Sequence, residues 1–200
     1  GFLLPVIKNS TKRGFQFGIP YYLAISPSQE ATVYLDVMTK RGVGTGADYR
    51  YMMRSGGHGE INAYLLYDTD RDMTRGNLLA RHQQYFSPTL FLSADIALTM
   101  DRDFYRDFGE VTGEYNKQYL ESTAFLTKQW DRFSLTSELR YTEDLYAANN
   151  NLTLQKLPII TFTGIKQQLG PSPFFISFDS SFTDFYRDNG TKGQRLDLHP

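Results

Sequence analysis

The residue types that most often carry chemistry are few and scattered in this sequence. His58, His82 and His199 lie far apart, and none has a serine, aspartate or cysteine partner at a recognised catalytic or metal-binding spacing. Because the chain contains no cysteine, it can form neither a disulfide nor a thiolate metal site. We therefore interpret the histidines as isolated polar residues, and we predict no enzymatic activity, no cofactor and no metal site.

Two short segments resemble ligand-binding loops but lack residues that such loops require. Asp68-Thr69-Asp70-Arg71-Asp72 begins like a calcium loop, yet Met73 replaces the glycine and no distal glutamate follows in register. We interpret it as a solvated acidic loop and leave calcium binding open. The run Gly42-Val43-Gly44-Thr45-Gly46 is followed by no helix, so it indicates a turn entering a strand rather than a dinucleotide loop.

The composition limits the class of protein that these residues can belong to. The chain has 200 residues, of which 40% are hydrophobic and 15% aromatic, with a net charge of −1 and a mean hydropathy of −0.43. The length allows one domain or two small ones. No apolar run is long enough for a transmembrane helix, and aromatic residues at this density do not stay solvated in a disordered chain. The balanced charge, without basic blocks, argues against a nucleic-acid surface.

The elements that must position these side chains are strands, because apolar residues recur at every second position. About twelve strands are predicted, with turn clusters between them and without a helix that has a credible cap and apolar stripe. The clearest alternation covers Phe15–Tyr21, Ala31–Val37, Ala47–Met53, Ile61–Tyr67, Leu90–Met100, Phe133–Tyr141 and Phe174–Phe182. Weaker alternation covers Leu3–Lys8, Leu78–Phe86, Tyr119–Lys128, Ile159–Lys166 and Arg195–His199.

Period-two strands occur both in soluble sandwiches and in membrane barrels, and three features favour the barrel. The better runs approach ten residues, rings gather toward the strand ends, and short connections alternate with long polar ones. The long polar segments are Asp68–Asn77, Asp101–Asn116, Thr142–Asn151 and Asp184–Gln194. Charged residues then lie on a polar face that we expect to line a lumen, and they are Asp36, Asp48, Arg50, Glu60, Asp95, Glu121, Glu138, Arg140, Asp179, Arg195 and Asp197. In a sandwich the same residues would form a solvent face.

The most specific motif of the sequence is the block Pro20-Tyr21-Tyr22-Leu23-Ala24-Ile25-Ser26-Pro27, together with Arg41-Gly42 and Tyr49-Arg50-Tyr51. This motif resembles the start of the barrel of the lipopolysaccharide (LPS) assembly outer-membrane proteins, the LptD family. Gly1-Phe2-Leu3-Leu4-Pro5, the segment from Asp101 to Phe108 and the closing Arg195–Pro200 are also similar. The resemblance runs along the whole chain in order.

This resemblance implies an all-β fold in which residues 1–200 form about twelve antiparallel strands, the first half of a larger transmembrane barrel. The periplasmic jellyroll and the closing strands would then be absent from this sequence, and its open edges would prevent it from forming a native barrel alone. The implied location is the outer membrane of a Gram-negative bacterium. The implied partners are LPS, an LptE-like lipoprotein plug and, through the jellyroll, an LptA-like periplasmic bridge protein.

The resemblance also implies a function, the insertion of LPS into the outer leaflet through a lumen and a lateral gate between the first and last strands. Prolines that weaken strand pairing would help that gate to open, and Pro5 and Pro20 lie in the first two predicted strands. The predicted gate residues are Pro5, Pro20, Phe15, Phe17 and Tyr21. A strand start or a bulge is the ordinary explanation of such prolines. A porin-like diffusion channel, an outer-membrane hydrolase and a soluble glycan-binding sandwich remain as alternative functions.

Overall fold

A computed structural model shows twelve strands and one short helix in residues 1–109, 114, 116–168 and 170–199, which are the residues that the structure describes. Parts of the predicted polar segment Asp101–Asn116, and Pro200 of the closing motif, therefore lie outside the description. The elements are β1 (Val6–Ser10), β2 (Gly14–Ser26), β3 (Gln29–Met38), β4 (Gly42–Met52), β5 (Gly57–Asp68), β6 (Met73–Ser87), β7 (Leu90–Thr99), α1 (Phe104–Phe108), β8 (Tyr119–Gln129), β9 (Phe133–Asp144), β10 (Gln155–Gln168), β11 (Phe175–Tyr186) and β12 (Gly193–His199).

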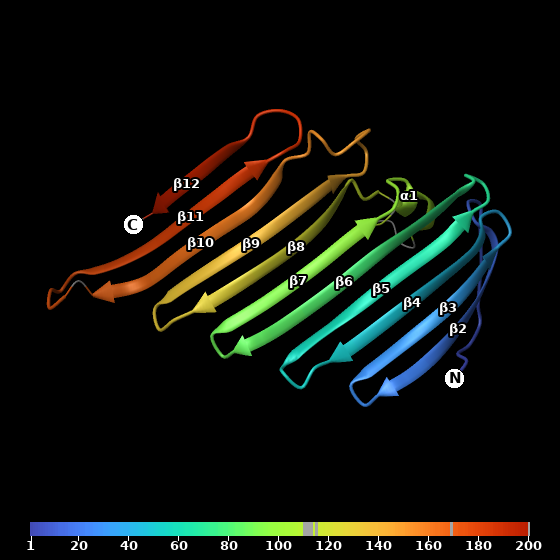
Figure 1. The fold of residues 1–200 in the computed structure, drawn as a ribbon, viewed down its shortest axis with the longest axis horizontal. Helices are drawn as coiled ribbons and strands as arrows, with labels where there is room; N and C mark the ends of the chain where they lie inside the picture. The colour runs from blue at the N-terminus through green and yellow to red at the C-terminus, as the bar shows by residue number, and fades with distance from the viewer. Residues whose placement is uncertain (110–113, 115, 169, 200) are drawn as a thin grey trace. The chain divides into compact units, whose positions relative to one another are not determined.

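The strands follow one another in a single sheet whose order is the order of the chain, from β1 to β12 (Figure 1). This arrangement confirms the predicted all-β fold with antiparallel strands. β2, β6 and β10 have 13, 15 and 14 residues, which is longer than the strands of most globular sheets. Such lengths are enough for a tilted strand to cross a bilayer.

The chain divides into two compact units, which we describe separately. Unit 1 contains Gly1–Arg81 and Ile96–Gln118, and unit 2 contains His82–Asp95 and Tyr119–Pro200. Unit 1 thus contains β1 to β5, the first part of β6, the last part of β7, and α1. Unit 2 contains the rest of β6 and β7 together with β8 to β12.

The two faces of unit 1 differ in the way that the alternation predicts. Residues directly opposed in an antiparallel pair share a face, and the register pairs Gly18 with Asp36, and Asp36 with Gly44. Even-numbered residues of β2 to β5 therefore share a polar face. Their odd-numbered neighbours are apolar and remain exposed, among them Phe15, Ile19, Val33, Leu35, Val37, Val43 and Leu65. Exposure of so many large apolar side chains on one face is typical of a surface that contacts lipid or a partner.

The buried core of unit 1 lies on the polar face, where α1 packs at one end of the strands. Phe104, Tyr105 and Phe108 of α1 are buried, as are Met38 at the end of β3 and Leu66 near the end of β5. Figure 1 shows α1 next to the end of β7. The helix was not predicted from the sequence, because it makes a single turn and no side chain caps its N-terminus. In the described residues, no helix has the length and apolar content needed to cross a membrane.

Two sequence interpretations of the connections were wrong. The segment Asp68–Asn77, predicted as a long polar connection, lies mostly within strands, since β5 ends at Asp68 and β6 begins at Met73. The glycine run from Gly42 to Gly46 lies inside β4 and is not a turn. Glycine is required there because tyrosine rings cover the strand: a Cβ at Gly44 would lie 2.2 Å from the Tyr64 hydroxyl, and one at Gly46 would lie 2.3 Å from the Tyr34 ring.

Candidate functional site

Among the described residues of unit 1, the largest fully buried side chain is a charged one, Arg75 at the start of β6. Its guanidinium is fully buried and contacts three carboxylates from different parts of the chain. Nη1 lies 2.9 Å from Asp68 and 2.8 Å from Asp107, while Nε and Nη2 donate to the two oxygens of Asp101 at 2.9 and 2.7 Å. A planar guanidinium suits this arrangement because its donors match paired carboxylate oxygens.

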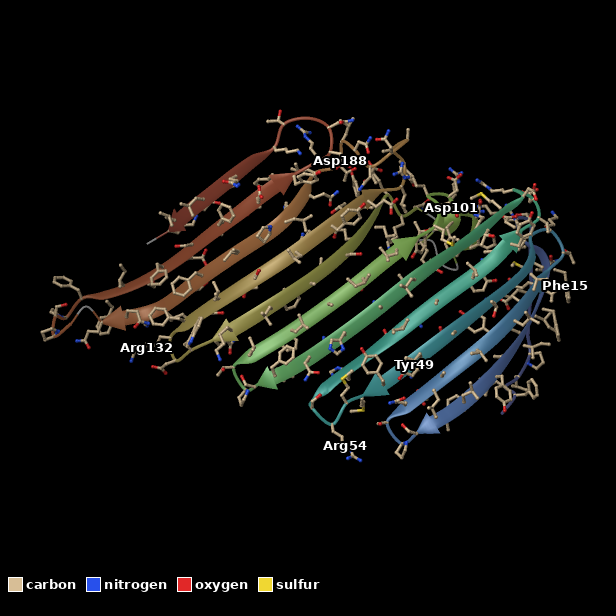
Figure 2. All side chains as sticks on the ribbon, viewed as in Figure 1. Phe15, Tyr49, Arg54, Asp101, Arg132 and Asp188 are labelled. Carbon is tan, nitrogen blue, oxygen red and sulfur yellow. The ribbon has the colours of Figure 1, made fainter. Side chains whose placement is uncertain are left out.

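Two further arginines extend this cluster to the neighbouring turns. Arg41, in the β3–β4 turn, lies 3.0 Å from both Asp68 and Asp70. Arg13, in the β1–β2 turn, donates to the carbonyl oxygens of Phe108 at 3.3 Å and Gly109 at 3.1 Å. These residues join the ends of β2, β4, β5, β6 and β7 to the α1 segment, and we call them the clasp: Arg13, Arg41, Arg75, Asp68, Asp101 and Asp107. Figure 2 shows Asp101 at this end of the strands and Arg54, in the β4–β5 turn, at the opposite end.

A fourth arginine, Arg71 of the β5–β6 turn, forms ion pairs with two carboxylates of the α1 segment. It lies 2.8 Å from Asp103 and 3.0 Å from Asp107. The bond from Arg71 lowers the pKa of the Asp103 carboxyl and, in turn, raises the pKa of the Arg71 guanidinium. Burial raises the pKa of the Tyr105 phenol. The Asp103 carboxyl is therefore held in its charged form, and the Tyr105 phenol is held neutral.

Aromatic rings complete the attachment of α1. The Phe108 ring lies beneath the guanidinium groups of Arg75 and Arg41, at 5.1 and 5.8 Å from its centroid. Phe104 contacts Phe108 with centroids 5.2 Å apart, and Tyr64 of β5 with centroids 6.5 Å apart. Charge pairs and ring contacts thus hold the helix against the polar face.

Between α1 and the polar face lies a hollow of about 410 Å³. Asp36, Asp48, Tyr34 and Tyr64 line it from β3 to β5, and Pro20 lines it from β2. The Tyr64 hydroxyl donates to Asp36 at 3.2 Å, and Asn62 donates to Asp48 at 2.9 Å. The hollow therefore combines carboxylates, amides and flat rings, a set that can bind hydroxyl-rich molecules by hydrogen bonds and ring contacts.

The pairing of β1 with β2 changes register near the two prolines, and we call this region the seam. Val6 pairs with Gly18, whereas Phe2 bridges to Tyr21, so the first strand has one additional residue between the two pairs. The Leu3 amide donates to the Pro20 carbonyl at 3.0 Å, which shows that the Pro20 backbone faces the first strand. In an antiparallel sheet, the backbone nitrogen and carbonyl oxygen of one residue face the same neighbouring strand. The N–H that Pro20 lacks would therefore have pointed toward the first strand, so the seam lacks one hydrogen-bond donor.

The predicted gate residues lie at this seam but not on one face. Pro5 immediately precedes β1, so it marks a strand start rather than lying inside the strand as predicted. Pro20 lies within β2 and lines the hollow. Phe15, Phe17 and Tyr21 are odd-numbered residues of β2 and lie on the opposite, apolar face, where Tyr21 packs edge-to-face on Phe2 with centroids 4.9 Å apart.

The predicted lumen residues share one face within each unit. In unit 1, Asp36, Asp48, Arg50 and Glu60 are even-numbered on adjacent strands, and Arg50 pairs directly with Glu60. In unit 2, the register connects Asp95 to Thr123, and Thr123 to Arg140, whose guanidinium lies 2.6 Å from Glu138. The register also places Asp179, Asp197 and Arg195 on this face of unit 2, through the pairs with Thr163, Ser181 and Thr183.

The sequence did not predict the clasp, and one of its residues, Asp68, was interpreted wrongly. Asp68 was assigned to a solvated loop, but it is fully buried between Arg41 and Arg75. The available signal was an arginine or aspartate at each of several strand ends, without a fixed spacing that would have grouped them. In the part of the chain that the structure describes, no cluster of histidine and carboxylate side chains could hold a metal ion. The three histidines lie on three different strands, β5, β6 and β12.

Long antiparallel strands, an exposed apolar face and a charged opposite face together define the chain as a segment of a transmembrane β-barrel. Comparison with known proteins narrows this class. The family model described as LPS transport system D, LptD, matches residues 73–200. The chain therefore belongs to the LptD family.

The relatives that match are named LPS-assembly protein LptD. One from Bordetella avium is 35% identical over 107 residues, which is 54% of this chain and 13% of the relative. Those from Vibrio vulnificus strain YJ016 and Ralstonia nicotianae are 25% and 24% identical over the whole chain. The chain spans 26% and 25% of these two relatives, or about a quarter of their length.

Proposed function

We propose that this chain is part of an outer-membrane translocon that inserts LPS into the outer leaflet of a Gram-negative bacterium. The observation that carries the proposal is the seam, where Pro20 removes a backbone donor that faces the first strand. Membership of the LptD family supports LPS as the transported molecule. The function involves transport and assembly, and none of its steps needs covalent chemistry by this chain.

The polar face supports a path for the saccharide part of LPS. The charged residues that the sequence assigns to it comprise eight acidic and three basic side chains; the structure adds Arg81, which pairs with Glu60, so acidic groups still predominate among these residues. Carboxylates and amides accept and donate hydrogen bonds to hydroxyl groups. The hollow beneath α1 brings Asp36, Asp48, Tyr34 and Tyr64 together on this face.

The seam supports lateral exit of the acyl chains. A backbone hydrogen bond contributes on the order of 1 kcal/mol net, and more where the alternative is lipid rather than water. The pairing of the first two strands lacks the Pro20 donor and shifts register by one residue, so it is weaker than that of β2 with β3, which keeps one register from Gln16 to Ala24. We propose that this weak pairing near Pro5 and Pro20 loosens the first strand, so that the lateral gate between the first and last strands of the barrel can open, and that Phe15, Phe17 and Tyr21 line the exit on the apolar side.

The proposed partners follow from the family rather than from a contact in this structure. They are LPS itself, an LptE-like lipoprotein that plugs the barrel, and an LptA-like bridge protein that delivers LPS through a periplasmic jellyroll.

Site-specific photocrosslinking in the full-length protein tests the proposed gate. A photoreactive residue replacing Phe15 or Tyr21 should form LPS adducts during transport. Leu139 of β9, an exposed apolar residue of unit 2, is the matched control and should form few. Adducts equally frequent at all three positions would indicate contact with bulk lipid, and absence of adducts at Phe15 and Tyr21 would remove the gate assignment.

A further inference from the structure

The apolar face of unit 1 is not flat. It contains a hollow of about 500 Å³ across β3 to β7, lined on its apolar side by Val33, Ala47, Ala63, Leu65, Leu78 and Leu98. No charged side chain lines it. The hollow lies on the opposite side of the strands from Asp36, Asp48 and α1, so it is separate from the proposed transport path.

The hollow forms where small residues lie side by side on adjacent strands. Ala47 and Ala63 are directly opposed on β4 and β5, and Gly76 lies beside them on β6. A Cβ at Gly76 would lie 2.4 Å from the Tyr64 carbonyl oxygen and 3.3 Å from Leu65 Cδ1, so glycine is needed to bring β6 this close. Leu65 and Leu98, both largely exposed, stand on either side.

The shape and chemistry fit an extended hydrocarbon chain. A volume near 500 Å³ is within the range of specific small-molecule sites, and walls of leucine, valine and alanine offer dispersion contacts without a polar group to be desolvated. In a transmembrane barrel the apolar face contacts lipid, which means that an acyl chain is the molecule present at this surface.

The position of the hollow identifies the leaflet. Val33 lies near the middle of β3, and the residues of β4 to β7 lie from the middle of each strand toward the clasp, since β4 and β6 begin there, and β5 and β7 end there. The long segment that contains α1 leaves from this same end, whereas the β2–β3 turn at the other end is only Pro27 and Ser28. In outer-membrane barrels the longer connections are extracellular, so the hollow faces the outer leaflet.

We infer that this hollow is a binding site for an acyl chain of LPS resident in the outer leaflet. The site stands on the transmembrane fold and does not depend on the proposed gate. An acyl chain of the bound LPS would fill the hollow between Leu65 and Leu98. The LPS molecule would remain with the protein after the bulk lipid is removed.

Equilibrium crosslinking on the purified full-length protein tests this site without any transport. With p-benzoylphenylalanine replacing Val33 at the edge of the hollow, added LPS should form an adduct in detergent, and added phosphatidylethanolamine, which offers fewer acyl chains per molecule, should form less. The variant Ala63→Phe fills the hollow and displaces several methylenes, so the LPS adduct should fall by about tenfold or more. Ala124→Phe, on the apolar face of unit 2, is the control and should leave the adduct unchanged.

Three outcomes would overturn the inference: no LPS adduct, an adduct with phosphatidylethanolamine alone, or an LPS adduct that Ala63→Phe does not reduce. If Ala63→Phe fails to give the heat-modifiable band of a folded barrel, Ala47→Leu provides a milder filling of the same hollow. Because no transport takes place, a negative result here would leave the proposed gate untouched, and failure of the gate would leave this site untouched.

Discussion

Arg75 is the buried centre of the clasp in unit 1. It contacts the carboxylates of Asp68, Asp101 and Asp107, so its loss removes the arginine bound to Asp101 and one of the arginines bound to Asp68 and to Asp107. Breaking a buried pair in this way costs about 3–5 kcal/mol. We expect Arg75→Met to lower the free energy of unfolding by that amount and to expose the α1 segment to protease.

Arg81 on the same strand provides the control for this experiment. It forms an ion pair with Glu60 at 3.1 Å, but both side chains are largely exposed to solvent. Exposed pairs contribute about 0–1 kcal/mol, so Arg81→Met should have little effect on urea unfolding followed by the heat-modifiable band. Equal losses for the two variants would contradict the assigned role of the clasp.

The titration of Asp103, which lies beside the clasp, gives the attachment of the α1 segment a direction of pH dependence. Its pKa is lowered in the folded protein by the hydrogen bond from Arg71, from an ordinary value of 3.8. The stabilisation is therefore complete above about pH 3.8 and is lost as the pH falls below that value. Hydrogen exchange at Phe104–Phe108 should accelerate in that acid range, and in Asp103→Asn the exchange should already be faster at neutral pH, with a weaker acid dependence.

At the scale of the secondary-structure elements, the strength of pairing at the seam between β1 and β2 depends on the amide hydrogen that Pro20 lacks. Pro20→Ala supplies an N–H that points toward the first strand, which should strengthen that pairing by about 0.5–1.5 kcal/mol. The expected result is slower hydrogen exchange in β1 and slower insertion of LPS. Pro27→Ala in the β2–β3 turn changes the same residue type away from the seam and should affect neither measurement. Faster insertion in Pro20→Ala would contradict the proposed gate.

The strands could be predicted from the sequence, whereas the short helix and the register could not. Strands were predictable because each has one lipid-facing and one polar face, and the alternation is therefore strong in β3 or β9. The five-residue α1 has no periodic pattern, and it exists because Arg13, Arg75 and ring contacts bind it from distant strands. The glycines of β4 look like a turn in sequence, since nothing local shows that Tyr34 and Tyr64 cover them. The predicted gate residues lie in or beside β1 and β2, and their division between two faces depends on the register, which the sequence does not contain.

At the scale of the whole molecule, the assignment of lipid to one face and water to the other makes a quantitative prediction. Leu35 and Thr32 lie on β3, three residues apart, on opposite faces of unit 1; Leu35 is exposed, and Thr32 lines the polar hollow beside Asp48, its direct neighbour on β4. Leu35→Arg places a charge in hydrocarbon near the middle of the strand and should cost about 2–4 kcal/mol. Thr32→Arg places the same charge beside a carboxylate in water and should be close to neutral. Urea unfolding of the full-length protein in lipid vesicles measures both variants, and a soluble protein would give the opposite ranking, with Thr32→Arg, on the more buried face, as the costly change.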